Sequence, residues 1–444
     1  MTPFRPLSLS ILSLALGAAL CAPAQAQSLL ALVESARTYD TAWQSARAQL
    51  DAAARKADQA RAGLLPSAAL TGGLNRSNVE LSKPKIENTG TAQTVGINAS
   101  QPLYRPANRI TLEQGQRGVD VAQAQLDAAT QDLLVRVSQA YFDVLAAQDT
   151  LTFVQAQKAA VSEQLAAAKR NFEVGTTTVT DSREAQARYD LVIAQEIAAE
   201  NDLRVKRLAL DQLVGITGTK PLPLALPVQL PSVVPDNLTT WVDTARDQQP
   251  GVRQAAIALD IARLETKKAE TGHLPTVDLQ AGYNVTRNLH GTITSPGVTA
   301  RSNAASVGVA LNLPLFAGFA VQNRVKETLA LETKAEADLE TARRNVAQAT
   351  RAAFYGVQSG QGQVQALEAA EASSQSALDA NKLGYQVGVR INIDVLNAQS
   401  QLYQTKRDLA QARYNVLLGG LKLRQAAGTL SQQDIEAVNA LLAK

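Results

Sequence analysis

The sequence predicts a mixed fold of long helices and strand pairs, built as two copies of one unit. The first observation is a duplication, because "FEVGTTTVTD" at 172–181 returns as "YQVGVRINID" at 385–394 and aligns Gly175 with Gly388. The second is the alternation of apolar and polar residues in 276–286, which is typical of a strand with one apolar face. The third is a pair of long stretches without proline, each following such a strand pair. A supersecondary unit that recurs at a fixed spacing indicates an internally duplicated fold.

The duplication covers most of the chain. "GLLP" at 63–66 matches "GHLP" at 272–275, and Tyr141-Phe142 matches Phe354-Tyr355. Between the copies lies the proline-rich segment "KPLPLALPVQLPSVVPD", which cannot be helical and marks a connector. The predicted organisation is therefore as follows: a first repeat at 27–219, the connector at 220–236, a second repeat at 237–428 and a C-terminal tail at 429–444.

Each repeat is expected to contain three helical segments. An Ala-rich helix opens each repeat, at about 29–62 and 238–271. The long helices are predicted at about 107–171 and 318–383, and some 65 residues at 1.5 Å each give roughly 100 Å of helix. A shorter helix follows each long one, so that two short helices could stack end to end beside a long one. Apolar residues spaced by three and four, such as Leu134, Val137 and Tyr141, favour coiled-coil contact.

The strands are predicted from period-two patterns. Residues 277–285 and 305–313 alternate clearly, and the first repeat does so more weakly around 68–74 and 95–100. The segments that join the strands of each pair, 78–92 and 289–303, are rich in Gly, Ser and Asn and are expected to be exposed loops. Four strands cannot close a barrel in lipid, so a membrane-inserted form must be an oligomer.

The N-terminus predicts export. Residues 1–26 carry Arg5, an apolar run and "AQA", the pattern of a secretory signal peptide cut after Ala26. A lipoprotein anchored at Cys21 is the alternative, but bulky Leu20 precedes that cysteine. Cleavage at Ala26 removes the one cysteine, which excludes disulfides and thiol chemistry from the mature chain. The mature chain has no apolar run of about 18 residues, so we expect any membrane insertion to use strands.

Composition and motifs argue against nucleic-acid binding and against catalysis. The formal net charge is +3, with acidic and basic residues interspersed, which does not form a nucleic-acid footprint. The two histidines, His273 and His290, lack metal-ligand spacing, and no metalloprotease, hydrolase or phosphate-loop motif occurs. We therefore expect no catalytic residues, no metal and no cofactor.

The residues resemble the TolC family of outer-membrane channel-tunnels, which serve drug efflux and type I protein secretion. The resemblance runs through "QPLY", "AYFDVL", "QLVGITG", "GHLPTVDL", "GYQVGVRINIDVLNAQ" and "AAGTLSQQDIEAVNALL" and covers nearly the whole mature chain. It implies a homotrimer whose four strands per chain make a 12-stranded β-barrel, continued by a periplasmic α-helical coiled-coil barrel. The connector and the C-terminal tail would lie at its equator. The implied partners are outer-membrane lipid, a periplasmic adaptor protein and an inner-membrane pump or ABC exporter.

The resemblance also implies a gate at the periplasmic tip. Gly175 and Gly388 would allow the tip turns, where an adaptor could make contact. Tyr385 and Arg390 resemble residues that constrict the entrance, and Thr180 and Asp181 resemble their partners.

Asp394 resembles an acidic ring residue, and threefold symmetry would place three such carboxylates around one opening and attract cations. The family's efflux archetype has a second Asp one helical turn later, where this chain has Asn397, so we expect weaker cation selectivity. From the residues alone, Asp181 and Asp394 could instead be helix N-caps, with Asp181 and Glu184 as a capping-box-like pair.

An alternative function is a periplasmic coiled-coil adaptor or structural protein without a barrel. Such a protein would share the signal peptide and the long helical hairpins. The two alternating strand pairs, at 67–104 and 276–316, favour the channel. Between drug efflux and protein secretion the residues do not decide.

Overall fold

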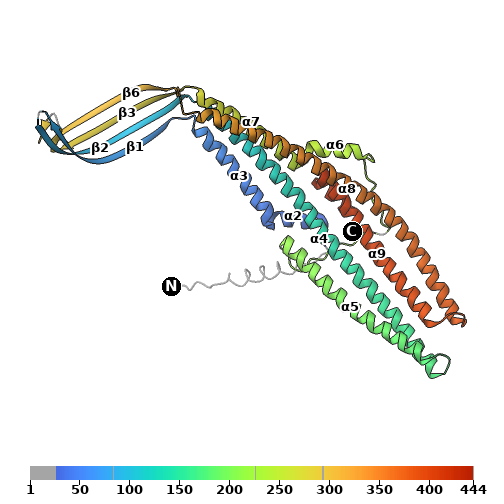
Figure 1. Cartoon of the computed structure of the whole chain (residues 1–444). Coiled ribbons are helices and arrows are strands. Elements are labelled where there is room, and N and C mark those ends of the chain that lie inside the picture. Colours follow the sequence, from blue (N-terminus) through green and yellow to red (C-terminus); the bar gives the residue numbers. More distant parts are fainter. Residues whose placement is uncertain (1–26, 84, 226, 293–294, 444) are drawn as a thin grey trace, which may run out of the picture. The chain divides into compact units, whose positions relative to one another are not determined.

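The two halves of the chain repeat one order of elements. The computed structural model describes residues 27–83, 85–225, 227–292 and 295–443. The predicted signal peptide lies outside these residues. The first half contains α2 (Leu29–Tyr39), α3 (Thr41–Ala62), β1 (Ser67–Ser82), β2 (Lys85–Tyr104), α4 (Pro106–Glu173) and α5 (Val179–Val214). The second contains α6 (Leu238–Gln248), α7 (Pro250–Glu270), the short 3₁₀ helix η2 (Thr271–His273), β3 (Thr276–Leu289), β6 (Ala300–Asn312), α8 (Ala320–Gln386) and α9 (Asn392–Ala427) (Figure 1). The predicted duplication and both long helices are confirmed.

The opening helix of each repeat is broken in two, where the sequence predicted one helix. The break in the first repeat is at Asp40, whose backbone is extended and whose Oδ1 accepts a hydrogen bond of 2.7 Å from the Trp43 backbone N–H. This bond caps the start of α3. In the second repeat Pro250 is the first residue of α7, where its missing N–H costs nothing. None of the described helices is both long and apolar enough to cross a membrane.

The chain forms two compact units, each assembled from several segments. One unit, here called the helical unit, comprises residues up to Ala46, Asp127–Pro250 and the chain from Arg343. The other, here called the sheet unit, comprises Arg47–Leu126 and Gly251–Ala342. The boundaries fall within helices, so α4 and α8 contribute residues to both units.

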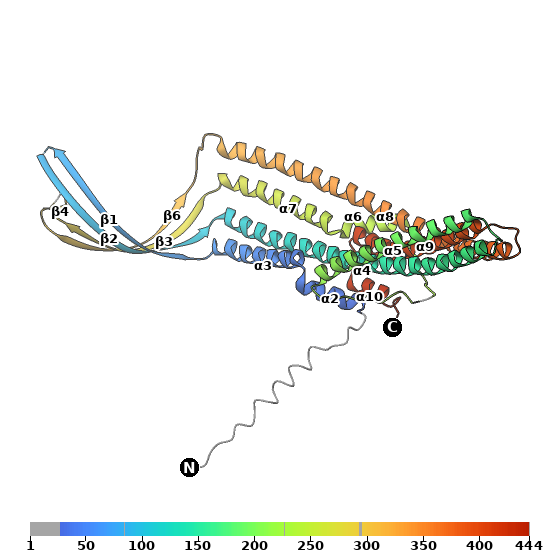
Figure 2. The same cartoon turned by 90° about the horizontal axis from the view of Figure 1, so that it is seen from below.

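The sheet unit contains one antiparallel sheet with the strand order β1-β2-β3-β6 (Figures 1 and 2). The second strand of the first repeat therefore pairs with the first strand of the second repeat. All four predicted strands are present, but the predicted loop at 78–92 is wrong, because Ser82 pairs with Lys85 and the ladder continues almost to the turn. Backbone hydrogen bonds across the hairpin outweigh the polar side chains that suggested a loop. Part of 289–303 is also paired, as the two-residue strands β4 (Gly291–Thr292) and β5 (Ser295–Pro296).

The register of the sheet collects the apolar residues on one face. Directly paired residues share a face, and Leu70 pairs with Ile97, which pairs with Tyr283. On the same face, Leu279 of β3 pairs with Val309 of β6. These side chains are exposed; for example, Leu70 is 74% exposed and Val309 63%. The sheet thus presents an apolar face that stays exposed among the residues the structure describes.

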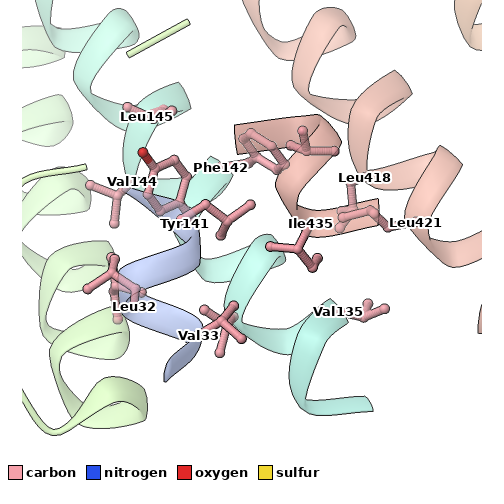
Figure 3. Close-up of a cluster of buried hydrophobic side chains, with 14 of the residues drawn as sticks. Leu32, Val33, Val135, Tyr141, Phe142, Val144, Leu145, Leu418, Leu421 and Ile435 are labelled. Atoms are coloured by element: carbon pink, nitrogen blue, oxygen red, sulfur yellow. The ribbon is translucent and has the colours of Figure 1, made fainter. Parts of the chain in front are cut away.

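The helical unit holds the main apolar core. It is formed by α2, α4, α5, α9 and the C-terminal helix α10 (Gln432–Asn439). Figure 3 shows Leu32 and Val33 of α2 facing Tyr141 and Phe142 of α4, with Ile435 of α10 among them. Both side chains of the Tyr141-Phe142 pair are almost fully buried, and Phe142 stacks on Tyr414 at 5.6 Å.

The connector and the C-terminal tail lie together on this core. The Ala225 N–H donates to the Leu441 carbonyl at 2.9 Å, and the Ala443 N–H donates to the Pro223 carbonyl at 2.7 Å. The Tyr141 hydroxyl of α4 donates a hydrogen bond of 2.9 Å to the Leu222 carbonyl of the connector. Prolines remove backbone donors from the connector, and these bonds satisfy three of its remaining backbone polar groups.

Candidate functional site: the tip of the helical hairpins

Two glycines close the turns at which each long helix reverses into a shorter one. Gly175 follows α4 with φ +77°, and Gly388 follows α8 with φ +81°. At the first turn the Thr176 N–H donates to the Asn171 carbonyl at 2.8 Å and the Gly175 N–H to the Phe172 carbonyl at 3.0 Å. The second turn repeats this pattern, which is a Schellman motif with glycine in the left-handed conformation. Both glycines thus adopt the positive φ that these turns require.

The start of α5 is a capping box formed by Thr178 and Asp181. The Thr178 backbone N–H donates to Asp181 Oδ2 at 3.1 Å, and the Asp181 backbone N–H donates to Thr178 Oγ1 at 3.3 Å. The predicted N-cap role of Asp181, with Glu184 as its pair, is therefore wrong: Asp181 is the third helical residue and Thr178 is the cap. A tip turn three residues longer would have been needed to put Asp181 at the cap.

The start of α9 carries an ion pair in place of a side-chain cap. Ile391 occupies the N-cap position, so Asp394 is the third residue of the helix and not its N-cap. The Arg390 guanidinium lies 3.6 Å from Asp394 Oδ2, and both side chains are partly exposed, at 59% and 33%. A carboxylate in the first turn of a helix is also favoured by the helix dipole. Asp394 is thus held in place by its own chain, with one positive charge beside it.

Two further predicted gate residues connect the two hairpins of the chain. Asn171 Nδ2 donates to the Tyr385 hydroxyl at 3.2 Å, which links the end of α4 to the end of α8. Arg188 Nη2 donates to Asn397 Oδ1 at 2.8 Å, which links α5 to α9. The residue that stands where the family archetype has a second acid therefore anchors an arginine of the other hairpin.

Thr180 is an exposed residue at the start of α5. Among the described residues, the side chain of Tyr385 is hydrogen-bonded by Asn171, and that of Arg390 is paired with Asp394. The pairing of Tyr385 and Arg390 with Thr180 and Asp181 stays a prediction.

A buried amide that the sequence reasoning missed lies between the hairpins. Asn392, at the start of α9, is 1% exposed; its Oδ1 accepts from Gln164 Nε2 of α4, and its Nδ2 donates to the Asp181 carbonyl at 3.5 Å. One signal was available in the sequence. Asn392 falls on the stripe that continues through Val395, Leu396 and Gln399 at helical spacing, and a polar residue on an apolar stripe usually has a buried partner.

The tip of the chain joins its two hairpins through polar contacts. Within the described ranges, no three His, Cys, Asp or Glu side chains are grouped so that they could hold a metal ion. The tip provides polar links between two hairpins of coiled helices, together with one carboxylate that lies next to an arginine. Such links can break and reform without any change in the chain's covalent structure.

Comparison with known proteins shows the family. The Outer membrane efflux protein family matches the chain twice, at residues 32–216 and 241–429. The chain belongs to this family. TolC of Vibrio cholerae is 36% identical over 94% of this chain and 94% of the relative. TolC of Escherichia coli is 33% identical over 95% of this chain and 86% of the relative, and the protease secretion protein PrtF of Dickeya chrysanthemi is 31% identical over 93% and 90%.

Solved structures of outer membrane efflux proteins share the fold. VceC of Vibrio cholerae superposes with a TM-score of 0.77 at 20% identity and covers 90% of this chain and 96% of its own. The CmeC outer membrane channel of Campylobacter jejuni gives the same TM-score at 16% identity, over 94% and 90%. As a member of the outer membrane efflux proteins, this chain is an outer-membrane exit duct of an export system. Its relatives are channel and export proteins and are not enzymes.

Proposed function

We propose that the chain works as a homotrimeric, passive channel-tunnel that is gated at its periplasmic tip. The observation that carries the proposal is the exposed apolar face of the four-stranded sheet. Its outer strands β1 and β6 each have one neighbour within the chain. In lipid both free edges must be paired, and three copies of the sheet would close a 12-stranded barrel without an edge.

The alternative, a periplasmic adaptor or coiled-coil protein without a barrel, does not explain why one face of this sheet is apolar and exposed. Cell fractionation distinguishes the two functions. The channel predicts trimers in the outer-membrane fraction that migrate differently on gels before and after heating. Recovery as a monomer in the periplasmic fraction would support the adaptor.

The gate proposal can be tested at Asp394 in planar bilayers. We expect a trivalent cation to block the channel from the periplasmic side through three carboxylates, and Asp394→Ala to abolish the block. Because Arg390 lies 3.6 Å from Asp394, we expect Arg390→Ala to have the opposite effect and strengthen both cation selectivity and block. Asp408→Ala, further along α9, is the matched control. Equal block in the unmodified channel and in Asp394→Ala would refute the assignment.

We further propose that the partners are a periplasmic adaptor protein and an inner-membrane pump or ABC exporter. A passive channel has no energy source of its own, so a partner must supply the energy for transport through it. Val174 and Val387 lie at the two tips and are 72% and 65% exposed, so cysteines at these positions would be accessible to a crosslinker. Capture of an adaptor from a drug pump would indicate efflux, and capture of one from an ATP-driven exporter would indicate protein secretion.

We also propose that residues 1–26 are removed during export and that the mature protein resides in the outer membrane with its helices in the periplasm. Family membership supports the outer-membrane location. The mass of the intact purified protein tests the cleavage. A chain that begins at Gln27 is the expected result, and a lipid-modified chain that begins at Cys21 would favour the lipoprotein alternative.

A further inference from the structure

A polar cavity lies in the helical unit between α4, α5 and α9. Its volume is about 390 Å³. Its lining contains two arginines, Arg188 of α5 and Arg407 of α9, and no Asp or Glu. Apolar side chains such as Val161 and Leu396 form part of the wall. The three helices lie side by side in Figure 2, and α5 and α9 are in contact. A cavity with two cations and no carboxylate in its lining is suited to an anionic guest.

The two guanidinium groups are held apart along α9 by neutral amides. Arg188 Nη2 donates to Asn397 Oδ1 at 2.8 Å, and Arg407 Nη2 donates to Gln404 Oε1 at 2.5 Å. Asn397 and Gln404 are seven residues apart, so they lie on one face of α9 and are separated by about 10 Å. Carboxamides orient a guanidinium but do not neutralise it.

The environment of Arg407 disfavours its charge. Burial lowers the pKa of Arg407, an effect that the neighbouring Asp408 opposes. Asp408 lies outside the cavity lining and accepts a hydrogen bond of 2.7 Å from Gln404 Nε2. A carboxylate bound at Arg407 would offset the loss of hydration.

Two glutamine side chains that line the cavity have acceptors that lack a donor among the described residues. Gln157 of α4 is 4% exposed, and its Oε1 has no hydrogen-bond partner among the described residues. The Oε1 of Gln195 on α5 is in the same state. Both residues line the cavity. A buried acceptor without a donor is costly, so a guest with hydroxyl groups between its ends would satisfy both.

We propose that this cavity binds an elongated dianion that carries hydroxyl groups, of the class of six-carbon sugar diacids. One carboxylate contacts Arg188, the other contacts Arg407, and the hydroxyl groups between them donate to Gln157 and Gln195. The length fits, because a six-carbon chain with bonds of about 1.5 Å, extended by a hydrogen bond of about 2.8 Å at each end, covers the roughly 10 Å along α9 between Asn397 and Gln404, the amides to which the two guanidinium groups are bonded.

The proposal is tested by isothermal titration of the purified, detergent-solubilised protein with galactarate. We expect saturable binding of galactarate. Adipate, which has the same chain without hydroxyl groups, should bind about tenfold more weakly, because it leaves both glutamine acceptors unsatisfied. Galactitol, which has the hydroxyl groups without the carboxylates, should not bind.

Variants locate the site. Arg188→Gln and Arg407→Gln should each weaken galactarate binding by about tenfold or more, because each removes one charge-assisted contact. Arg204→Gln, on the exposed side of α5, is the matched control and should bind as the unmodified protein does. Circular dichroism and the melting temperature of each variant check that it is folded.

Three results would overturn the proposal. Galactarate that shows no saturable binding excludes the site. Binding that both cavity variants leave unchanged, or that Arg204→Gln weakens equally, places the anion elsewhere. A loss in only one of the two cavity variants excludes a guest that bridges both arginines.

Discussion

Arg105 and Asp278 form a double hydrogen-bonded ion pair between the two repeats. Arg105 Nε lies 2.8 Å from Asp278 Oδ1, and Nη2 lies 2.6 Å from Oδ2. Arg105 immediately precedes α4 in the first repeat, whereas Asp278 belongs to β3 of the second. Asp278 is 7% exposed, so its carboxylate depends on this partner. Parallel bonds from one guanidinium fix an orientation as well as a distance.

We expect Asp278→Ala to lower the free energy of unfolding by about 1.5–3 kcal/mol, because charge-assisted hydrogen bonds of a buried group are lost. Urea unfolding monitored by circular dichroism measures the change. Asp58→Ala is the control, since the Arg55–Asp58 pair at 3.3 Å is exposed at both ends. Its removal should cost less than about 1 kcal/mol. Equal effects of the two substitutions would contradict a special role for the Arg105–Asp278 pair.

The break between α2 and α3 predicts a pH dependence at Asp40. Burial would raise the pKa of Asp40, but hydrogen bonds from Arg136 and from the Trp43 N–H outweigh it and lower the pKa. For an acid with a lowered pKa, the stabilisation is present above the unfolded value and is lost as the pH falls through the folded value. The charge of Asp40 therefore stabilises the fold at neutral pH.

Asp40→Asn keeps a cap acceptor and removes the ion pair with Arg136, which measures 2.9 Å. We expect it to cost about 1.5–3 kcal/mol at pH 7 and much less at pH 3. Tryptophan fluorescence during urea unfolding is a suitable probe because Trp43 is adjacent. Asp132→Asn, which removes the exposed partner of the same arginine, is the control. A pH-independent loss in Asp40→Asn would show that the charge is not the cause.

A buried carboxyl in the core predicts the opposite pH effect. Burial raises the pKa of Asp149, although the Tyr414 hydroxyl donates to its Oδ2 at 2.7 Å and opposes the shift. Folding then favours the protonated acid, so the ionised group destabilises the fold increasingly as the pH rises from the unfolded to the folded value. We expect Asp149→Asn, which retains an acceptor for Tyr414, to raise the melting temperature at pH 8 and to lose this advantage near pH 4. Tyr414→Phe checks whether the hydrogen bond itself matters.

The two kinds of glycine in the α8–α9 hairpin should respond oppositely to alanine. Gly388 has φ +81°, where an L side chain is strained, so Gly388→Ala should cost about 1–2 kcal/mol. Gly356 lies within α8, and a Cβ there would meet nothing within 4 Å. Gly356→Ala should therefore stabilise the protein by about 0.5–1 kcal/mol. The melting temperatures of the two variants test this prediction. A shift of the same sign in both variants would contradict the turn assignment.

Much of the candidate site could be predicted because it depends on local chemistry. The positive φ of Gly175 and Gly388 follows from a glycine at the end of a helical pattern, and the duplication points to both at once. The roles of Asn397 and Asn392 could not be predicted in this way. Their partners, Arg188 and Gln164, lie on other helices, and no spacing within one helix specifies which side chains meet across a bundle.

The sequence by itself determined the duplication, the four strands, the two long helices and the turns between them, because periodicity and glycine position act over a few residues. Tertiary structure decided the pairing of β2 with β3 between the repeats. It also decided that Arg188 bonds to Asn397 and that Arg188 and Arg407 line one cavity. These features depend on contacts between residues far apart in the chain, whose free energy can outweigh the local preferences of either partner.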